Sequence, residues 1–160
     1  MSETVYIETS IFSFYYDRRN SPAVVAMRDW TRQWWDSHRQ RYAVTTSTAV
    51  LAELDTGHFP HRQDALSLAM NLPAIPIEDE IREIVEIYIK HHLMPVNPLG
   101  DALHLAVASF HKIDYLLTWN CEHLANANKF GHIRRINTLL GLHVPAIVTP
   151  LELMGGVEND

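Results

Sequence analysis

Three acidic residues interrupt apolar segments of this sequence. Glu8 ends an apolar run over residues 5–7, Glu53 lies inside another over 50–54, and Asp101 stands where an apolar helical pattern begins. Taken singly, Glu8 fits the solvent-exposed end of a strand, Glu53 a solvent-exposed helix face, and Asp101 a helix cap. Brought together, each ionised pair about 5 Å apart would repel by roughly 3 kcal/mol. Mg²⁺ or Mn²⁺ relieves such repulsion, so the joint pattern favours an oxygen-ligand metal site that activates water or holds phosphate.

The elements that must position these acids alternate between strand and helix. Strands are predicted at 5–8, 42–46, 115–118 and near 147–148, with an extended piece at 73–77. Helices are predicted after residue 9, over 21–39, from 47 to 57, and over 61–71, 79–91, 99–111 and around 134. This alternation predicts a three-layer α/β/α fold with a mostly parallel central sheet.

Ligands of such sheets bind beyond the carboxyl ends of the strands. Glu8 and Asp101 fit that place, and Asn120 follows the strand that ends at Thr118. Glu53 is two turns into its helix and would have to reach inward from the side.

Composition and charge limit the classes of protein to consider. The chain has 160 residues, 47% of them hydrophobic, which predicts one domain over 1–160 with an ordered core at about 4–150 and a flexible tail at 155–160. The longest apolar runs are too short for a membrane span, and the N-terminus has no signal-like region, so we expect a cytoplasmic protein. The single cysteine, Cys121, excludes an intrachain disulfide and a thiolate zinc cluster.

A formal charge of −6 argues against general electrostatic attraction of nucleic acid. Six of the 13 basic residues nevertheless lie between Arg18 and Arg41, and a smaller group comprises Lys129, Arg134 and Arg135. Two interpretations stay open for these groups. They are either solvated helix faces or a footprint for a phosphate backbone.

Aromatic residues and histidines have similar alternatives. The tryptophans of the 21–39 helix are expected in the core, with a partner surface at Trp34 and Trp35 as the alternative. Tyr15 and Tyr16 pack internally or stack on bases. The adjacent histidines at 91 and 92 point about 100° apart on a helix and cannot easily share a zinc ion. His104 lies one turn beyond Asp101 on the same helix face and is expected to make a structural hydrogen bond, with contact to the site as the alternative.

Four short segments occur in an order typical of one family. They are Tyr6-Ile7-Glu8-Thr9-Ser10, Ala52-Glu53-Leu54, Gly100-Asp101-Ala102-Leu103-His104-Leu105-Ala106 and Leu117-Thr118-Trp119-Asn120. On these segments the chain resembles PIN-domain proteins, in particular the VapC-like toxin ribonucleases of toxin–antitoxin pairs. The segments span most of the chain, and the Asp-Ala-x-His-Leu-Ala stretch is the most specific of them.

The resemblance implies a catalytic set at the family's four acidic positions: Glu8, Glu53, Asp101 and Asn120. The metal, Mg²⁺ or Mn²⁺, would be held by Glu8, Glu53 and Asp101, with Ser10 and Thr118 as supporting hydroxyls. Two positions depart from the usual pattern, because Glu8 replaces the commoner Asp and Asn120 replaces an acid. We expect an altered site rather than an abolished one.

The activity implied by the resemblance is metal-dependent hydrolysis of RNA phosphodiesters by a toxin, with Arg18 and Arg19 near the RNA. An inhibitory antitoxin and a homodimer are implied as partners, with candidate surfaces around Phe12, Phe14, Trp34 and Trp35. The alternative is a catalytically weak PIN-fold module that binds RNA or protein. A phosphoacceptor receiver domain is disfavoured, because no acceptor Asp and later Lys occupy suitable places.

Overall fold

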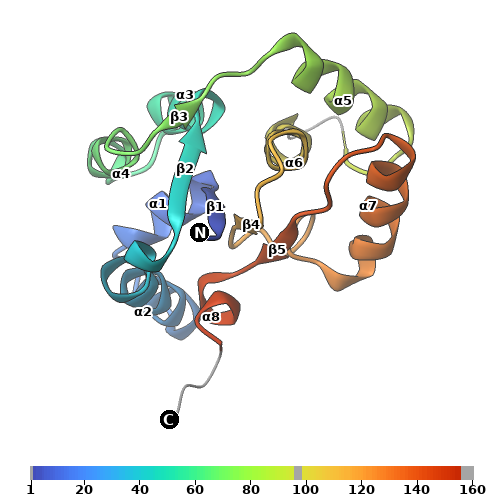
Figure 1. Ribbon diagram of the computed structural model, residues 1–160. Helices are drawn as coiled ribbons and strands as arrows, with labels where there is room; N and C mark the ends of the chain where they lie inside the picture. Colours follow the sequence, from blue (N-terminus) through green and yellow to red (C-terminus); the bar gives the residue numbers. More distant parts are fainter. Residues whose placement is uncertain (1, 96–98, 156–160) are drawn as a thin grey trace.

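The central sheet of the computed structural model, which describes residues 2–95 and 99–155, has five parallel strands in the order β3-β2-β1-β4-β5. The strands are β1 (Thr4–Ile7), β2 (Ala43–Ser47), β3 (Ala74–Ile75), β4 (Tyr115–Leu117) and β5 (Ala146–Val148). Helices flank the sheet, and Figure 1 shows the strands passing through the middle of the molecule. The predicted fold class is therefore confirmed. The predicted flexible tail lies outside the described residues except for Gly155.

The helices connect successive parallel strands. They are α1 (Thr9–Tyr15), α2 (Pro22–Ser37), α3 (Thr48–Thr56), α4 (Arg62–Ala69), α5 (Asp79–Lys90), α6 (Leu99–Phe110), α7 (Ala127–Leu139) and α8 (Pro150–Leu153), with a 3₁₀ turn at Arg39–Arg41. The sequence predicted the bounds of α2 to α6 to within a few residues, the entry to α1, and a helix around residue 134 where α7 lies. The short α8 was missed because four residues carry no helical period, although Thr149 and Glu152 form a capping box there.

Local sequence explains the helix starts. Ser21 caps α2 and Pro22 occupies its first position, while the Ser47 hydroxyl accepts a hydrogen bond from the Val50 N–H at the start of α3. The start of α1 differs from prediction. Glu8, rather than Thr9 or Ser10, is the cap, and its carboxylate accepts from the Ser10 N–H. Glu8 is therefore both the cap of α1 and a candidate site residue.

The core resolves the alternatives for the aromatic residues. Phe12 and Trp34 are fully buried and Trp35 is nearly so, and the ring of Trp35 packs edge-on against Phe12 and Trp34. The prediction of a tryptophan core is confirmed. The suggested partner surface at Phe12, Trp34 and Trp35 is wrong, because amphipathic α2 turns this stripe inward against α1.

A buried polar cluster ties α5, α6 and α7 together. The Tyr88 hydroxyl donates to Asn137 Oδ1 at 2.6 Å and contacts Ser109 Oγ at 3.3 Å, and Asn137 Nδ2 donates to the same serine. Burial raises the pKa of Tyr88 to about 12, against the hydrogen bonds to Ser109 and Asn137. Among the described helices, none combines the length and the apolar character needed to cross a membrane.

Candidate metal centre

The candidate site lies at the carboxyl edge of the sheet. Ile7 and Leu117, the last residues of β1 and β4, are paired in register, and the Glu8 N–H donates to the Leu117 carbonyl at 3.1 Å. Glu8 and Thr118 therefore leave neighbouring strands at the same level. Parallel pairing produces this convergence, since equivalent strand ends meet at one edge.

Hydroxyl groups hold one oxygen of the Glu8 carboxylate. Glu8 Oε1 accepts from Ser10 Oγ at 2.5 Å, from the Ser10 N–H at 3.1 Å and from Thr118 Oγ1 at 2.6 Å. Glu8 is only 7% exposed. These three donors fix the direction of the carboxylate. Ser10 and Thr118, the two hydroxyl residues that the resemblance named beside the acids, thus both bond to Glu8.

Glu53 approaches from α3 and meets His104 of α6. His104 Nε2 lies 2.9 Å from Glu53 Oε1, which also accepts a hydrogen bond from the Thr9 hydroxyl. Partial burial of Glu53 favours its neutral form, but the bond and charge of His104, with the Thr9 bond, lower the pKa of Glu53. The glutamate is therefore ionised at neutral pH.

His104 is fully enclosed and held from its other nitrogen. Its Nδ1 lies 2.6 Å from the Tyr6 hydroxyl, which in turn shares a 2.7 Å hydrogen bond with Ser47 Oγ. Burial opposes the charged imidazole, but the bond and charge of Glu53 raise the pKa of His104. The charges of Glu8 and Asp101 act in the same direction. The negative charges of all three acids therefore favour the protonated form of this imidazole.

Glu8, Glu53 and His104 form a group that could hold a metal ion. One ligand atom from each lies within 4.8 Å of the others. Carboxylate oxygens with one imidazole nitrogen suit Mn²⁺ or another first-row divalent ion, and suit Mg²⁺ less well because it prefers oxygen. The donor set thus fits a divalent cation, with the 37% exposed side chain of Glu53 open to solvent.

The Glu53 carboxylate occupies the space that a side chain at residue 100 would fill. A Cβ atom at residue 100 would lie 2.1 Å from Glu53 Oε2 and 3.7 Å from His104 Nε2. Any side chain there would displace the carboxylate. The sequence identified Gly100 as part of the Gly-Asp-Ala motif but did not predict this steric role.

Asp101 lies beside this group with both oxygens engaged elsewhere. It is 5% exposed, Asn120 Nδ2 donates to its Oδ1 at 2.8 Å, and His123 Nδ1 lies 2.8 Å from its Oδ2. Asn120 Oδ1 accepts from the backbone N–H groups of Glu122 and His123. The amide of Asn120 thus offers its nitrogen to Asp101 and uses its oxygen to order the following turn.

The structure therefore divides the four predicted site residues into two adjoining groups. Glu8 and Glu53 meet around His104, whereas Asp101 pairs with Asn120 and His123. His123 was missed, although its spacing of three residues from Asn120 after a strand was a usable signal. The neighbouring Cys121 thiol has its pKa raised by desolvation, which disfavours a thiolate nucleophile.

The two predicted RNA-binding arginines differ in their surroundings. Arg19 forms an ion pair with Asp17 at 2.6 Å. Arg18 is exposed and has no ion-pair partner among residues 2–95 and 99–155. Arg18 is therefore the freer of the two for an external anion.

Comparisons with known proteins identify the fold. No family model matches the sequence, and no curated protein matches it. Among solved structures, a chain of a toxin–antitoxin complex from Klebsiella pneumoniae is similar, with a TM-score of 0.55 and 16% identity over 91% of this chain and 97% of that one. A chain of VapBC2 from Rickettsia felis, solved bound to a promoter DNA fragment, has a TM-score of 0.57 and 12% identity over 91% and 98% of the two chains. At these identities the likeness shows the fold, which is PIN-like as the sequence motifs predicted.

Proposed function

We propose that this protein is a divalent-metal-dependent endoribonuclease and the toxin of a toxin–antitoxin pair. The observation that carries the proposal is the meeting of Glu8, Glu53 and His104 within 4.8 Å at the carboxyl edge of a PIN-like sheet. Asp101 adds a further buried carboxylate next to this group. The toxin–antitoxin complexes with similar chains support the same reading at the level of fold.

Mn²⁺ or Mg²⁺ would be held by Glu8 and Glu53, with His104 Nε2 beside them and Asp101 completing the negative charge. When bound, such an ion polarises a phosphodiester and lowers the pKa of water. With a metal bound, the Tyr6 hydroxyl would accept from Nδ1–H of His104, and Nε2, which lies against Glu53 Oε1 in this structure, would be the ligating nitrogen. This arrangement, in which a second group orients a ligating histidine, is the usual one in metalloproteins.

The chain's own residues would orient the reacting groups. Ser10 and Thr118 hold one oxygen of Glu8 and leave the other to face the site. Asp101, steadied by Asn120 and His123, would accept a hydrogen bond from the attacking water and direct it toward phosphorus. No covalent intermediate is needed for this hydrolysis.

RNA with exposed bases is the proposed substrate class, since single-stranded and looped segments are open to protein contacts. An inhibitory antitoxin, a homodimer and a cytoplasmic location complete the proposal. Phe14, which is partly exposed on α1, is the member of the earlier aromatic group that is still available for a partner.

Cleavage of a panel of structured and unstructured RNAs tests the activity. We expect cleavage with Mn²⁺ or Mg²⁺, none with chelator, and loss of activity by Asp101→Ala and Glu53→Gln. Glu83→Gln, at an exposed position of α5, serves as the matched control for Glu53→Gln. Cleavage that persists in chelator or in Asp101→Ala would refute the metal-nuclease proposal.

A catalytically weak binding module is the second candidate. The observation in its favour is that both oxygens of Asp101 are engaged by Asn120 and His123. In that case RNA or protein would bind without metal-dependent turnover. Binding of an RNA that is never cleaved under Mn²⁺ would favour this candidate over the nuclease.

A further inference from the structure

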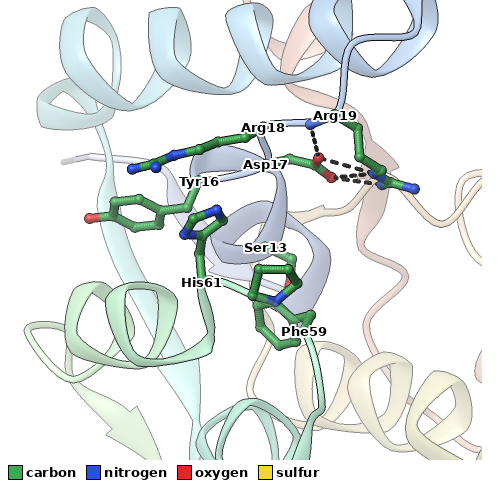
Figure 2. A pocket seen from close by; sticks show the side chains of 8 residues that line it. Ser13, Tyr16, Asp17, Arg18, Arg19, Phe59 and His61 are labelled. Atoms are coloured by element: carbon green, nitrogen blue, oxygen red, sulfur yellow. Dashed lines mark hydrogen bonds and ion pairs between the residues drawn. The ribbon is translucent and has the colours of Figure 1, made fainter.

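A cleft of about 500 Å³ opens between the end of α1 and the α3–α4 connection. Its lining includes Ser13, Tyr16, Arg18, Phe59 and His61. Figure 2 shows the Arg18 side chain extending to the same side as the Tyr16 ring, with His61 next to that ring. The guanidinium of Arg19 points the other way, onto Asp17. The cleft thus combines aromatic surface with one uncompensated positive charge.

The polar groups of this cleft are free to meet a ligand. His61 is the N-cap residue of α4 but makes no side-chain capping bond. Within the described part of the chain, neither the His61 ring nor the Arg18 guanidinium has a hydrogen-bond or ion-pair partner. By contrast, the other histidines near the candidate centre, His104 and His123, are both bonded to carboxylates.

The α1 wall of the cleft is connected to the candidate metal centre through Thr9. On α1, Ser13 Oγ donates to the Thr9 carbonyl at 3.3 Å, and the Thr9 hydroxyl donates to Glu53. Ser13 is one helical turn, about 6 Å, from Thr9. On the other wall, Phe59 closes against Gly57, where a Cβ atom would lie 2.9 Å from the ring. The α1 wall of the cleft therefore begins one helical turn beyond a residue that contacts Glu53.

We propose that this cleft binds one nucleobase of single-stranded RNA next to the reacting phosphate, an inference that rests on the proposed function. The base would stack on Tyr16 and His61, and Arg18 would hold the adjoining phosphate. Stacking on aromatic rings tolerates any base, because every base has a π-face. The arrangement selects for unpaired nucleotides, since a paired base cannot enter the cleft.

The charges favour RNA over a peptide as the occupant. A chain of net charge −6 repels a polyanion in general, so local positive charge is needed where RNA binds. Arg18 supplies that charge, whereas the adjacent Arg19 is neutralised. An acidic peptide would use the cation and an apolar peptide the rings, whereas a nucleotide uses both, with its phosphate on Arg18 and its base on the rings.

The test measures binding of single-stranded RNA decamers that carry 2-aminopurine at successive positions, in chelator so that no strand is cut. With wild-type protein we expect quenching of the 2-aminopurine fluorescence in the single-stranded decamers and no quenching with the matched duplex. Tyr16→Leu should weaken binding about tenfold and abolish the quenching, while Tyr16→Phe keeps both within about twofold. His61→Ala gives a second route to the same loss if Tyr16→Leu does not fold.

Arg18→Ala and Arg19→Ala form a matched pair, because each removes one positive charge. We expect Arg18→Ala to weaken binding severalfold and to reduce the salt slope by about one, and Arg19→Ala to change neither. RNA binding that is unaffected by the Tyr16, His61 and Arg18 variants would overturn the subsite and leave the nuclease proposal intact. Loss of a protein partner alone in these variants would assign the cleft to a peptide and also overturn it. Failure of the proposed function is distinguished by absent metal-dependent cleavage with wild-type protein.

Discussion

Replacing Gly100 by alanine should separate metal binding from folding. The added Cβ would lie 2.1 Å from Glu53 Oε2 and 3.3 Å from its Cδ. The carboxylate is the end of a flexible side chain, so it would move away by more than about 1 Å to reach van der Waals distance. That movement breaks the 2.9 Å contact with His104 and removes Glu53 from the ligand group.

The expected loss in Mn²⁺ affinity is about 10- to 100-fold, the range found when the groups that orient metal ligands are altered. At a metal concentration one hundred times the wild-type Kd, bound metal stabilises wild-type protein by about 2.7 kcal/mol. The same concentration would stabilise the variant by only roughly 0.4–1.4 kcal/mol. For a chain of this size the metal-induced rise in Tm would fall from about 5–11 °C to about 1–6 °C.

Isothermal titration with Mn²⁺ and thermal melts with and without the ion would measure both effects. Gly131→Ala is the matched control, because its Cβ would meet nothing nearer than Arg135 Nη1 at 3.9 Å. We expect that control to gain about 0.5–1 kcal/mol of stability from its helical position and to bind Mn²⁺ as wild type does. Wild-type Mn²⁺ affinity in Gly100→Ala would refute the assignment of Glu53 as a ligand.

Further predictions concern the buried tyrosines. Tyr88→Phe should cost about 1–3 kcal/mol in urea denaturation, because it leaves the buried Asn137 Oδ1 without its donor; an unchanged midpoint would contradict the buried network. The folded state raises the pKa of Tyr88 from 10.0 to about 12, so it favours the neutral phenol. This contribution of about 3 kcal/mol is fully present below pH 10 and is lost as pH rises to 12. Alkaline denaturation series should therefore show a smaller loss for Tyr88→Phe than for wild type, and parallel curves would rule this out. Tyr6→Phe removes the hydroxyl that orients His104 Nδ1, and we expect about 10-fold weaker Mn²⁺ binding by titration; binding equal to wild type would exclude an orienting role.

The fold could be predicted from local sequence patterns, because hydrophobic periodicity and the residues that start or end helices depend only on near neighbours in the chain. The alternation of strands and helices, the cap at Ser21 with Pro22, and the stop at Gly57 each depend on a few neighbouring residues. The inward placement of the tryptophans followed from their helical spacing for the same reason. The error over Phe12, Trp34 and Trp35 as a surface arose because periodicity marks an apolar face without saying what covers it.

The candidate site was predictable only in part. Glu8, Asp101 and Asn120 follow or precede elements whose ends meet at a parallel-sheet edge, so their general location could be read from sequence. The direction of their side chains could not. Asn120 presents its amide nitrogen to Asp101, and His123 joins the same carboxylate, because the turn after β4 brings both against α6.

The amino-acid sequence by itself determined the alternating architecture, the supply of acids at strand ends and the likeness to PIN-domain proteins. Tertiary structure decided which atoms meet. The contact of Tyr6 with His104 spans 98 residues, and that of Glu53 with His104 spans 51. These contacts depend on strand register and on how α3 and α6 are rotated against the sheet, which no local pattern encodes. For that reason a tyrosine inside an apolar strand contacts the histidine of the candidate metal centre, and a glycine at the start of α6 makes room for the carboxylate of Glu53.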